Sequence, residues 1–162
     1  MILCATGHRP PKIFPYKIPN PKYNWVYEKI KEAILELKPK QAISGMALGF
    51  DQLFADVCIE LHIPFIAAIP FIGQEKIWPQ HEKDKYHALL KQAADQHIVC
   101  EGGYSPDKMQ VRNCFMVDNS DVVLACFDGS KGGTGNCVDY AKSKNKRIVV
   151  IDPREFPNNS AL

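Results

Sequence analysis

The sequence has no apolar stretch long enough to cross a membrane. Its longest nearly apolar run, from Ile63 to Gly73, is interrupted by Pro64 and Pro70, whereas a spanning helix needs about 20 apolar residues. The first residues of the chain are apolar, but no charged segment with a longer apolar run accompanies them, so we expect no secretory signal. The sequence therefore predicts a cytoplasmic protein without a membrane partner.

A surplus of charge of one sign is missing as well. Lysine and arginine number 20 against 18 aspartates and glutamates, which leaves a formal net charge of +2. Proteins that bind nucleic acids usually carry a clear basic surplus on one face. We therefore do not expect a nucleic-acid partner.

Disulfide and metal-binding patterns are absent too. The chain has 6 cysteines but no C-x-x-C pair, and its 5 histidines do not follow the spacing of metal ligands. Most of the cysteines lie in or beside apolar runs, as buried thiols in a reducing compartment do. We expect reduced cysteines, and neither a metal nor another cofactor.

What the sequence does contain is a regular alternation of short apolar runs with amphipathic segments. The runs are continuous in apolarity, which is typical of parallel strands covered on both faces. They predict strands at Ile2–Ala5, Gln41–Ser44, Phe65–Ile69, Gln96–Val99, Val122–Cys126 and Ile148–Ile151. Helical periods lie between them, at Val26–Leu37, Leu53–Leu61, Pro79–Ala94, Asp107–Asn119 and Gly135–Lys144.

This alternation predicts an α/β fold with a six-stranded, mainly parallel sheet and helices on both faces. A chain of 162 residues is expected to form one domain, here over residues 1–152, with residues 153–162 as a C-terminal tail. The proline-rich segment Pro10–Pro21 must be an extended loop. The segment Gly102–Pro106 is a second loop.

Four loops after expected strands carry the candidate chemistry, because ligands of open α/β sheets bind at the carboxyl ends of the strands. They contain Thr6-Gly7-His8-Arg9, the segment Ser44–Asp51, Pro70-Phe71 with Trp78 a turn later, and the segment Asp128–Asn136. Glycines at two helix entrances let backbone N–H groups approach a ligand, and the helix dipole favours an anion there. Two such entrances in one domain predict a ligand with a phosphate.

The familiar phosphate-binding motifs are not matched. The loop Gly45–Asp51 lacks the Lys-Ser/Thr pair of a P-loop. The run Gly133-Thr134-Gly135 is followed by Val138 where a dinucleotide fingerprint has its third glycine. Taken singly, each glycine could equally serve a tight turn or close packing of a helix on a strand.

Several motifs follow one another along nearly the whole chain. They are Thr6-Gly7-His8-Arg9-Pro10, Ser44-Gly45-Met46-Ala47-Leu48-Gly49-Phe50-Asp51, Ile69-Pro70-Phe71, Trp78, Arg112-Asn113 with Met116-Val117-Asp118, and Gly132-Gly133-Thr134. Together they resemble the YpsA-like branch of the SLOG superfamily, which is named for its Smf/DprA and Lonely Guy members. The resemblance implies a Rossmann-like fold that binds nucleotides or nucleotide-derived ligands. With the alternation of elements, it predicts the strand order 3-2-1-4-5-6, counted along the chain.

Lonely Guy relatives hydrolyse the N-glycosidic bond of nucleoside 5′-monophosphates and release the free base. The chain keeps part of their motif, namely Arg112, Asn113, Met116, Gly132, Gly133 and Gly135. It departs from that motif at Lys131 and Asn136, and Asp139 stands where the catalytic glutamate would be. The resemblance therefore leaves hydrolase activity open.

Asp139 and Arg112 are the candidate catalytic residues. Breaking a ribosyl bond builds positive charge on the sugar, which a carboxylate such as Asp139 stabilises, and Arg112 could hold a phosphate bidentately. Both could equally be ordinary charges on a helix face. Phe71 and Trp78 could stack a base or fill the core, and His8 could polarise a leaving group or have a structural part only.

The function we expect is the binding of a nucleotide or ADP-ribose-like small molecule, by a sensor or ligand-binding protein. The alternative is a nucleoside 5′-monophosphate N-glycosidase. The expected ligand-binding residues are Thr6, Gly7, His8, Arg9, Ser44, Gly45, Met46, Gly49, Asp51, Pro70, Phe71, Trp78, Asn113, Asp128, Gly132, Gly133, Thr134, Gly135 and Asn136.

A homo-oligomer is expected as well. Lonely Guy relatives are commonly dimers. The loop Pro10–Trp25 presents Phe14, Tyr16, Tyr23 and Trp25, with little obvious core for them to fill. Exposed aromatic patches usually mark an interface.

Overall fold

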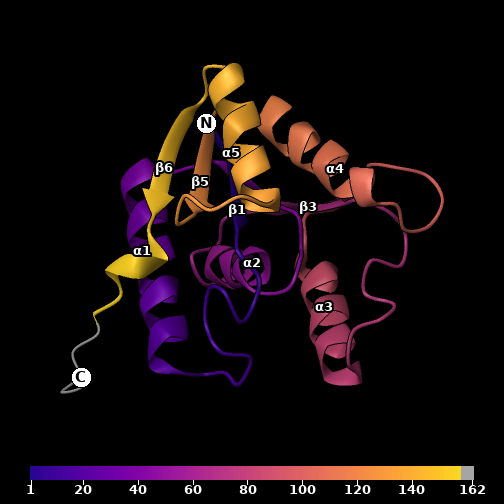
Figure 1. The fold of residues 1–162 in the computed structure, drawn as a ribbon, viewed down its shortest axis with the longest axis horizontal. Helices are drawn as coiled ribbons and strands as arrows, with labels where there is room; N and C mark the ends of the chain where they lie inside the picture. Colours follow the sequence, from indigo (N-terminus) through magenta and orange to yellow (C-terminus); the bar gives the residue numbers. More distant parts are fainter. Residues whose placement is uncertain (158–162) are drawn as a thin grey trace.

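The computed structural model describes residues 1–157. Its strands are β1 (Ile2–Gly7), β2 (Gln41–Ser44), β3 (Phe65–Ile69), β4 (Asp95–Ile98), β5 (Val122–Cys126) and β6 (Arg147–Ile151). Its helices are α1 (Pro21–Leu37), α2 (Phe50–Glu60), α3 (Gln80–Gln92), α4 (Pro106–Asp118) and α5 (Gly133–Ser143), followed by a short 3-10 turn, η1 (Pro153–Glu155). Strands and helices alternate along the chain, as the sequence predicts (Figure 1).

The six strands form one sheet in the order β4-β3-β2-β1-β5-β6, and every neighbouring pair is parallel. The predicted order 3-2-1-4-5-6 is therefore wrong at one strand, since β4 lies at the far edge and β5 pairs with β1. All four residues of β4, Asp95 to Ile98, are exposed. Such a polar strand is suited to an edge and not to the centre of a parallel sheet.

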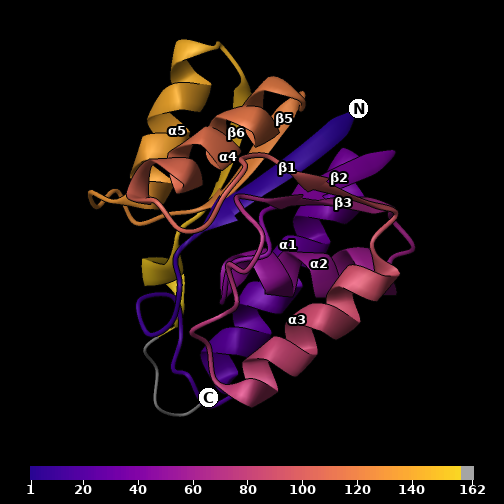
Figure 2. The same ribbon diagram turned by 90° about the vertical axis from the view of Figure 1, so that its right-hand side faces the viewer.

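Helices cover both faces of the sheet. In Figure 2, α1, α2 and α3 lie on one side and α4 and α5 on the other. The larger core cluster joins α1, α2 and α3 to the sheet, and the smaller one joins α4 and α5 to residues such as Cys4 and Val123. The predicted fold class, a single Rossmann-like α/β domain, is confirmed. To reach β5 from the edge strand β4, α4 must return across its face of the sheet.

The proline-rich segment before α1 is a loop, but it is packed against the core. Ile13 and Phe14 are buried, and the ring of Phe14 meets that of Tyr23 edge-on at 5.2 Å between centroids. The expectation that Phe14 presents a free aromatic surface is therefore wrong. Asn20 caps α1, because its side-chain oxygen accepts a hydrogen bond from the backbone nitrogen of Tyr23 at 2.9 Å.

The six cysteines are all free, and four of them are buried: Cys4, Cys58, Cys126 and Cys137. Burial raises the pKa of Cys4 to about 12, so its thiol stays protonated and unreactive. None of the helices within residues 1–157 is long and apolar enough to span a bilayer. The expected tail, 153–162, begins with a buried Pro153 and a contact of Phe156 with Trp25, and residues 158–162 lie outside the described part.

Candidate functional site

A cavity of about 340 Å³ opens at the carboxyl edge of the sheet, where the loops after β1, β2 and β5 meet α4. We call it the central cavity. Its lining residues are Thr6, Gly7, His8, Arg9, Lys12, Ala47, Asp51, Met109, Arg112, Asn113, Gly132, Gly133 and Thr134. The structure thus brings together three of the predicted loops, although their part in binding a ligand stays a prediction. The neighbouring positions of β2, β1 and β5 in the sheet cause this convergence.

Arg112 lies at the back of the central cavity and is only 4% exposed. Its Nη1 donates to the main-chain oxygen of Gly45 at 2.5 Å and lies 3.4 Å from that of Ala68. Its Nε donates to the side-chain oxygen of Asn113 at 3.0 Å. The remaining nitrogen, Nη2, has only a weak contact with the sulfur of Met109 at 3.8 Å. The guanidinium is therefore held in place by the chain itself.

Gly45 has to be a glycine for this contact. A Cβ on Gly45 would lie 2.5 Å from Nη1 of Arg112 and 2.9 Å from Oδ2 of Asp51. Both atoms belong to buried side chains that cannot move aside freely. The absence of a side chain at this position lets the arginine reach the backbone of the loop after β2.

Asp51 supplies the carboxylate of the central cavity, from the first turn of α2. It is buried, and its Oδ2 accepts a hydrogen bond from the backbone nitrogen of Ala47 at 3.3 Å. Burial raises the pKa of Asp51 above its usual value, while the nearby charge of Arg112 acts in the opposite direction. The site therefore holds the buried carboxyl group of Asp51 close to the buried positive charge of Arg112.

The entrance of α5 forms another part of the wall. The helix begins after Gly132, which has a φ of 144°, and no side chain caps its end. The first backbone N–H groups of a helix have no partner within it, and here Gly133 and Thr134 line the cavity. This end of α5 offers hydrogen-bond donors and the positive pole of the helix dipole.

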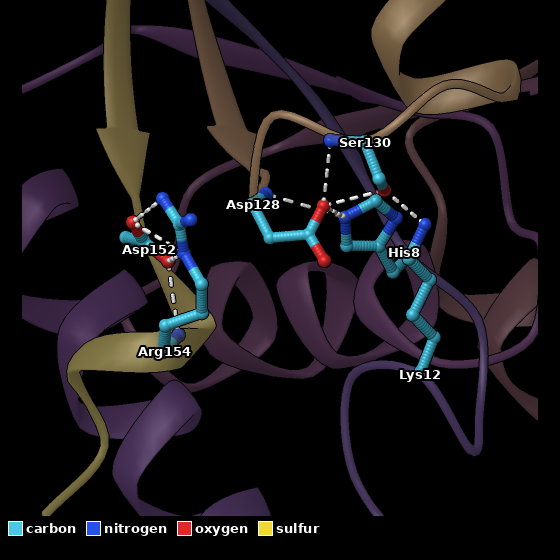
Figure 3. Close-up of polar contacts among 6 residues, drawn as sticks. All are labelled: His8, Lys12, Asp128, Ser130, Asp152 and Arg154. Atoms are coloured by element: carbon cyan, nitrogen blue, oxygen red, sulfur yellow. Dashed lines mark hydrogen bonds and ion pairs between the residues drawn. The ribbon is translucent and has the colours of Figure 1, made fainter.

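A polar network joins the loop after β1 to the loop after β5 (Figure 3). Nε2 of His8 lies 3.1 Å from Oδ1 of Asp128 and 3.3 Å from its backbone nitrogen. The same carboxylate accepts from the backbone nitrogen of Ser130 at 2.9 Å, and Lys12 donates to the hydroxyl of Ser130. A separate pair in the same view, Asp152 with Arg154, closes the turn after β6.

The surroundings shift the pKa values of two members of this network, Asp128 and His8. Hydrogen bonds from Ser130 hold the pKa of Asp128 well below its usual range. Burial lowers the pKa of His8, and the charge of Lys12 acts in the same direction. His8 is thus neutral at pH 7, and it serves to tie the two loops together.

Phe71 and Trp78 lie beside the central cavity and line a neighbouring one of about 560 Å³. We call this the aromatic cavity. Its lining residues are Arg9, Phe71, Ile72, Gly73, Gln74, Lys76, Ile77, Trp78, Gly103, Tyr104 and Met109. Pro70 is buried, and its carbonyl accepts a hydrogen bond from the backbone of Cys100 at 3.0 Å.

Other predicted site residues lie elsewhere. Asp139, Gly135 and Asn136 line a separate hollow of about 350 Å³ on the outer side of the α5 entrance, so Asp139 does not share the cavity of Arg112. Gly49 lines a fourth, apolar cavity.

Ser44 and Met46 support the loop after β2 from inside the core. Ser44 Oγ donates to the main-chain oxygen of Asp51 at 2.7 Å and accepts from the backbone nitrogen of Met46 at 3.2 Å. Both residues are fully buried. They therefore hold the shape of the site and do not line it.

Sequence reasoning missed Lys12, Ala47 and Met109 as lining residues of the central cavity. Ala47 lies inside a motif that was otherwise singled out. Lys12 follows Arg9 by three positions in a loop, and this basic pair was a signal that could have been used. Met109 has no such signal, because only the path of α4 across the sheet brings it to the cavity. Within residues 1–157, no three His, Cys, Asp or Glu side chains gather as metal ligands would.

Comparison with solved structures supports the fold. The domain is similar to DNA processing protein A (DprA) from Helicobacter pylori, with a TM-score of 0.66 and 17% identity over 94% of this chain and 65% of that one. It is similar to DprA from Streptococcus pneumoniae, with a TM-score of 0.65 and 17% identity over 93% of this chain. The chain spans half the length of that protein. A third likeness is to TM1055, with a TM-score of 0.58 and 16% identity over 91% of this chain and 71% of that one.

Comparison of sequences identifies closer relatives. The SPbeta prophage-derived protein YoqJ of Bacillus subtilis is 39% identical over 70% of this chain and 75% of its own length. A UPF0398 protein of Bacillus thuringiensis is 24% identical over 91% of this chain and 85% of its own length. A family model, YpsA, described as the YspA SLOG family, matches residues 3–156. The resemblance noted in the sequence is confirmed: this chain belongs to the YpsA family of SLOG proteins.

Proposed function

We propose that this protein binds a small nucleotide or an ADP-ribose-like ligand, as a sensor or ligand-binding protein, with a phosphate of that ligand in the central cavity. The observation that carries the proposal is the charge of the cavity wall. Three cationic side chains, Arg9, Lys12 and Arg112, line it together with the entrance of α5, against one carboxylate, Asp51. Such a wall suits an anion.

The arrangement also supports an orientation for the ligand. A phosphate is attracted to the N–H groups at Gly133 and Thr134 and to the side chains of Arg9 and Lys12. It is repelled by the carboxylate of Asp51. The sugar hydroxyls, which can donate hydrogen bonds to a carboxylate, would therefore face Asp51 while the phosphate faces α5. Arg112 would contribute through Nη2, the nitrogen that the backbone contacts leave available.

Calorimetric titration with AMP, ADP-ribose and adenosine tests the proposal. We expect AMP and ADP-ribose to bind more tightly than adenosine. The double variant Arg9→Ala/Lys12→Ala should lose roughly ten- to a hundredfold in affinity for AMP, because charge-assisted hydrogen bonds contribute about 1.5–3 kcal/mol each. Lys17→Ala is the matched control, since Lys17 is exposed in the same loop and does not line the cavity. Equal losses for AMP and adenosine in the double variant would contradict the assignment of the phosphate.

The alternative function is hydrolysis of the N-glycosidic bond in a nucleoside 5′-monophosphate. One observation favours it: Asp51 is a buried carboxyl group within the central cavity, and burial raises its pKa. Such a group can assist departure of a base. Incubation with a panel of nucleoside monophosphates, followed by chromatography, would detect free base. Loss of that product in Asp51→Asn but not in Asp139→Asn would assign the reaction to Asp51, and the reverse result to Asp139.

We also propose that the chain does not bind nucleic acid. The DprA protein of Helicobacter pylori is described as binding single-stranded DNA, but the net charge of this chain is only +2. Binding of single strands depends on a positively charged groove. Fluorescence anisotropy of a labelled single-stranded oligonucleotide at low salt is the test, and saturable micromolar binding would overturn the proposal.

A further inference from the structure

We propose that the aromatic cavity receives the base of the bound ligand and that Gln74 accepts a hydrogen bond from an N–H group on the edge of that base. This inference rests on the proposed function, because it presumes a phosphate in the central cavity. It adds the chemical class of the rest of the ligand: a planar heteroaromatic group with a hydrogen-bond donor.

The two cavities are adjacent to each other. Arg9 and Met109 line both of them. They also share a structural wall, because the main-chain oxygen of Gly45 accepts from Arg112 on one side at 2.5 Å and from Nε2 of Gln74 on the other at 3.3 Å. In the proposed binding mode, a ligand with its phosphate at α5 extends past Arg9 into the aromatic cavity.

Gln74 carries an acceptor that the described part of the chain leaves unused. The side chain is 5% exposed and lines the aromatic cavity. Its Nε2 donates to the oxygen of Gly45 and to the hydroxyl of Tyr86 at 3.1 Å. Its Oε1 is buried and has no hydrogen-bond partner among residues 1–157. Because a carbonyl oxygen can only accept, the contact with Gly45 fixes which end of the amide is the donor. Buried acceptors are normally paired, and a donor on a ligand would pair this one.

The remaining walls suit a flat apolar group. Phe71 and Tyr104 stand edge-on to one another, with ring centroids 5.9 Å apart and an angle of 76° between their planes. Trp78 lines the same cavity and is held edge-on by Tyr86 at 5.3 Å. Aromatic side chains can stack on any nucleobase, because every base has a flat π-face.

The rim of the cavity carries three large exposed side chains together with the exposed Lys76. Ile72, Ile77 and Tyr104 are 76%, 92% and 71% exposed. Large apolar side chains gathered around a hollow usually mark a binding site. The cationic Arg9 at the junction and the amide of Gln74 at the wall favour a polar aromatic ligand over a purely apolar occupant, such as a second copy of the chain.

Three probes test the phosphate site and the base site separately. Ribose 5-phosphate occupies the central cavity alone, AMP adds a base with an amino group, and purine riboside 5′-monophosphate adds a base without one. We expect AMP to bind wild-type protein about tenfold more tightly than purine riboside 5′-monophosphate, because the latter leaves the acceptor of Gln74 unpaired. Ribose 5-phosphate should bind more weakly than either.

Tyr104→Ala tests the stacking wall, because its ring is exposed and the change should not disturb the core. We expect the affinity for AMP to fall about tenfold or more, while that for ribose 5-phosphate stays unchanged. Leu35→Ala is the control, since Leu35 is 56% exposed, lies in α1 and lines neither cavity. It should change neither affinity.

The outcomes distinguish this inference from the function on which it rests. If none of the three probes binds, the proposed function fails and this inference with it. If ribose 5-phosphate binds as tightly as AMP, or if Tyr104→Ala leaves AMP affinity intact, only the base site is overturned. If Tyr104→Ala instead converts an oligomer into a monomer with AMP affinity unchanged, the cavity is an interface between copies and the inference is wrong.

Discussion

The Nη1 atom of Arg112 and the main-chain oxygen of Gly45 lie 2.5 Å apart, although 67 positions of sequence separate the two residues. This contact joins α4 to the loop after β2. Because the same oxygen also accepts from Gln74, one carbonyl group connects three segments of the site. The shape of both cavities therefore depends on the main-chain oxygen of Gly45. The contacts of a backbone oxygen cannot be predicted from a sequence motif.

Arg112→Ala should affect both stability and binding. Removing the guanidinium leaves the Gly45 carbonyl without a buried charged donor, and we expect the free energy of unfolding to fall by about 2–4 kcal/mol. Affinity for a nucleoside monophosphate should fall roughly ten- to a hundredfold more than that for the nucleoside. Urea denaturation and calorimetry measure the two effects. Arg9→Ala serves as the comparison, because Arg9 is exposed and its loss should change stability by less than about 0.5 kcal/mol.

Gly49→Ala should destabilise the fold by about 2 kcal/mol or more. Gly49 has a φ of 90°, and a Cβ there would lie 2.7 Å from the ring of Pro10 and 2.9 Å from the main-chain oxygen of His8. Both the backbone strain and the clash oppose a side chain. Gly103→Ala is the control, since a Cβ at Gly103 would meet nothing within 4 Å. Thermal or urea unfolding that gives the same stability for both variants would contradict the prediction.

The stability of the protein should decrease on mild acidification because of His8. Burial lowers the pKa of this residue from its usual 6.5, so the unfolded chain takes up a proton more readily than the folded one. The stability that the folded state gains from a neutral His8 is therefore fully present above pH 6.5 and is lost as the pH falls below that value.

Urea unfolding of wild type and His8→Gln at pH 7.5 and pH 5.5 measures this effect. The variant should lose less stability between the two values than the wild type does. Contributions from other groups, such as Asp51, cancel in the comparison. Identical pH dependence of the two proteins would show that His8 does not titrate across this range.

We propose that the chain forms a homo-oligomer through the loop before α1. Phe14 is buried, but Tyr16 and Ile18 in this loop are 66% and 37% exposed. Tyr16→Asp/Ile18→Asp should shift the assembly to a monomer, since charged groups disfavour an apolar contact. Light scattering at micromolar concentration is the measurement. A wild-type protein that is already monomeric under these conditions would refute the proposal.

Much of the fold could be predicted because its determinants are local. The strands β2, β3 and β5 have the predicted ends. The ends of the helices differ from the predicted ones by at most three residues, as helix ends often do, except that α1 begins at Pro21 and not at Val26. The polar residues of β4 are a signal for an edge strand, but tertiary packing decides which edge of the sheet it occupies. The alternation of elements and the family resemblance suggested a place beside β1, whereas the exposed residues Asp95 to Ile98 belong to an edge.

Some features of the candidate site could likewise be predicted from the sequence, and others could not. Glycines at Gly45 and Gly132 and the acid at Asp51 stand out in the sequence, since special backbone geometry and charge have residue-level signals. The unpaired acceptor of Gln74 and the position of Tyr104 have no such signal in the sequence. They depend on where the loops after β3 and β4 come to lie. The separation of Asp139 from Arg112 by the entrance of α5 is likewise a matter of three-dimensional placement.

The pairing of β1 with β5 has a consequence for the nascent chain. β1 is the first of the six strands of this sheet to leave the ribosome, yet its second neighbour spans Val122–Cys126. Synthesis proceeds at about 5–20 residues per second, so one edge of β1 stays unpaired for several seconds. Its residues Leu3 to Ala5 are fully buried in the folded protein. An open apolar edge is a template for intermolecular pairing. Any pause in translation before Val122 would lengthen the time for which this edge stays open.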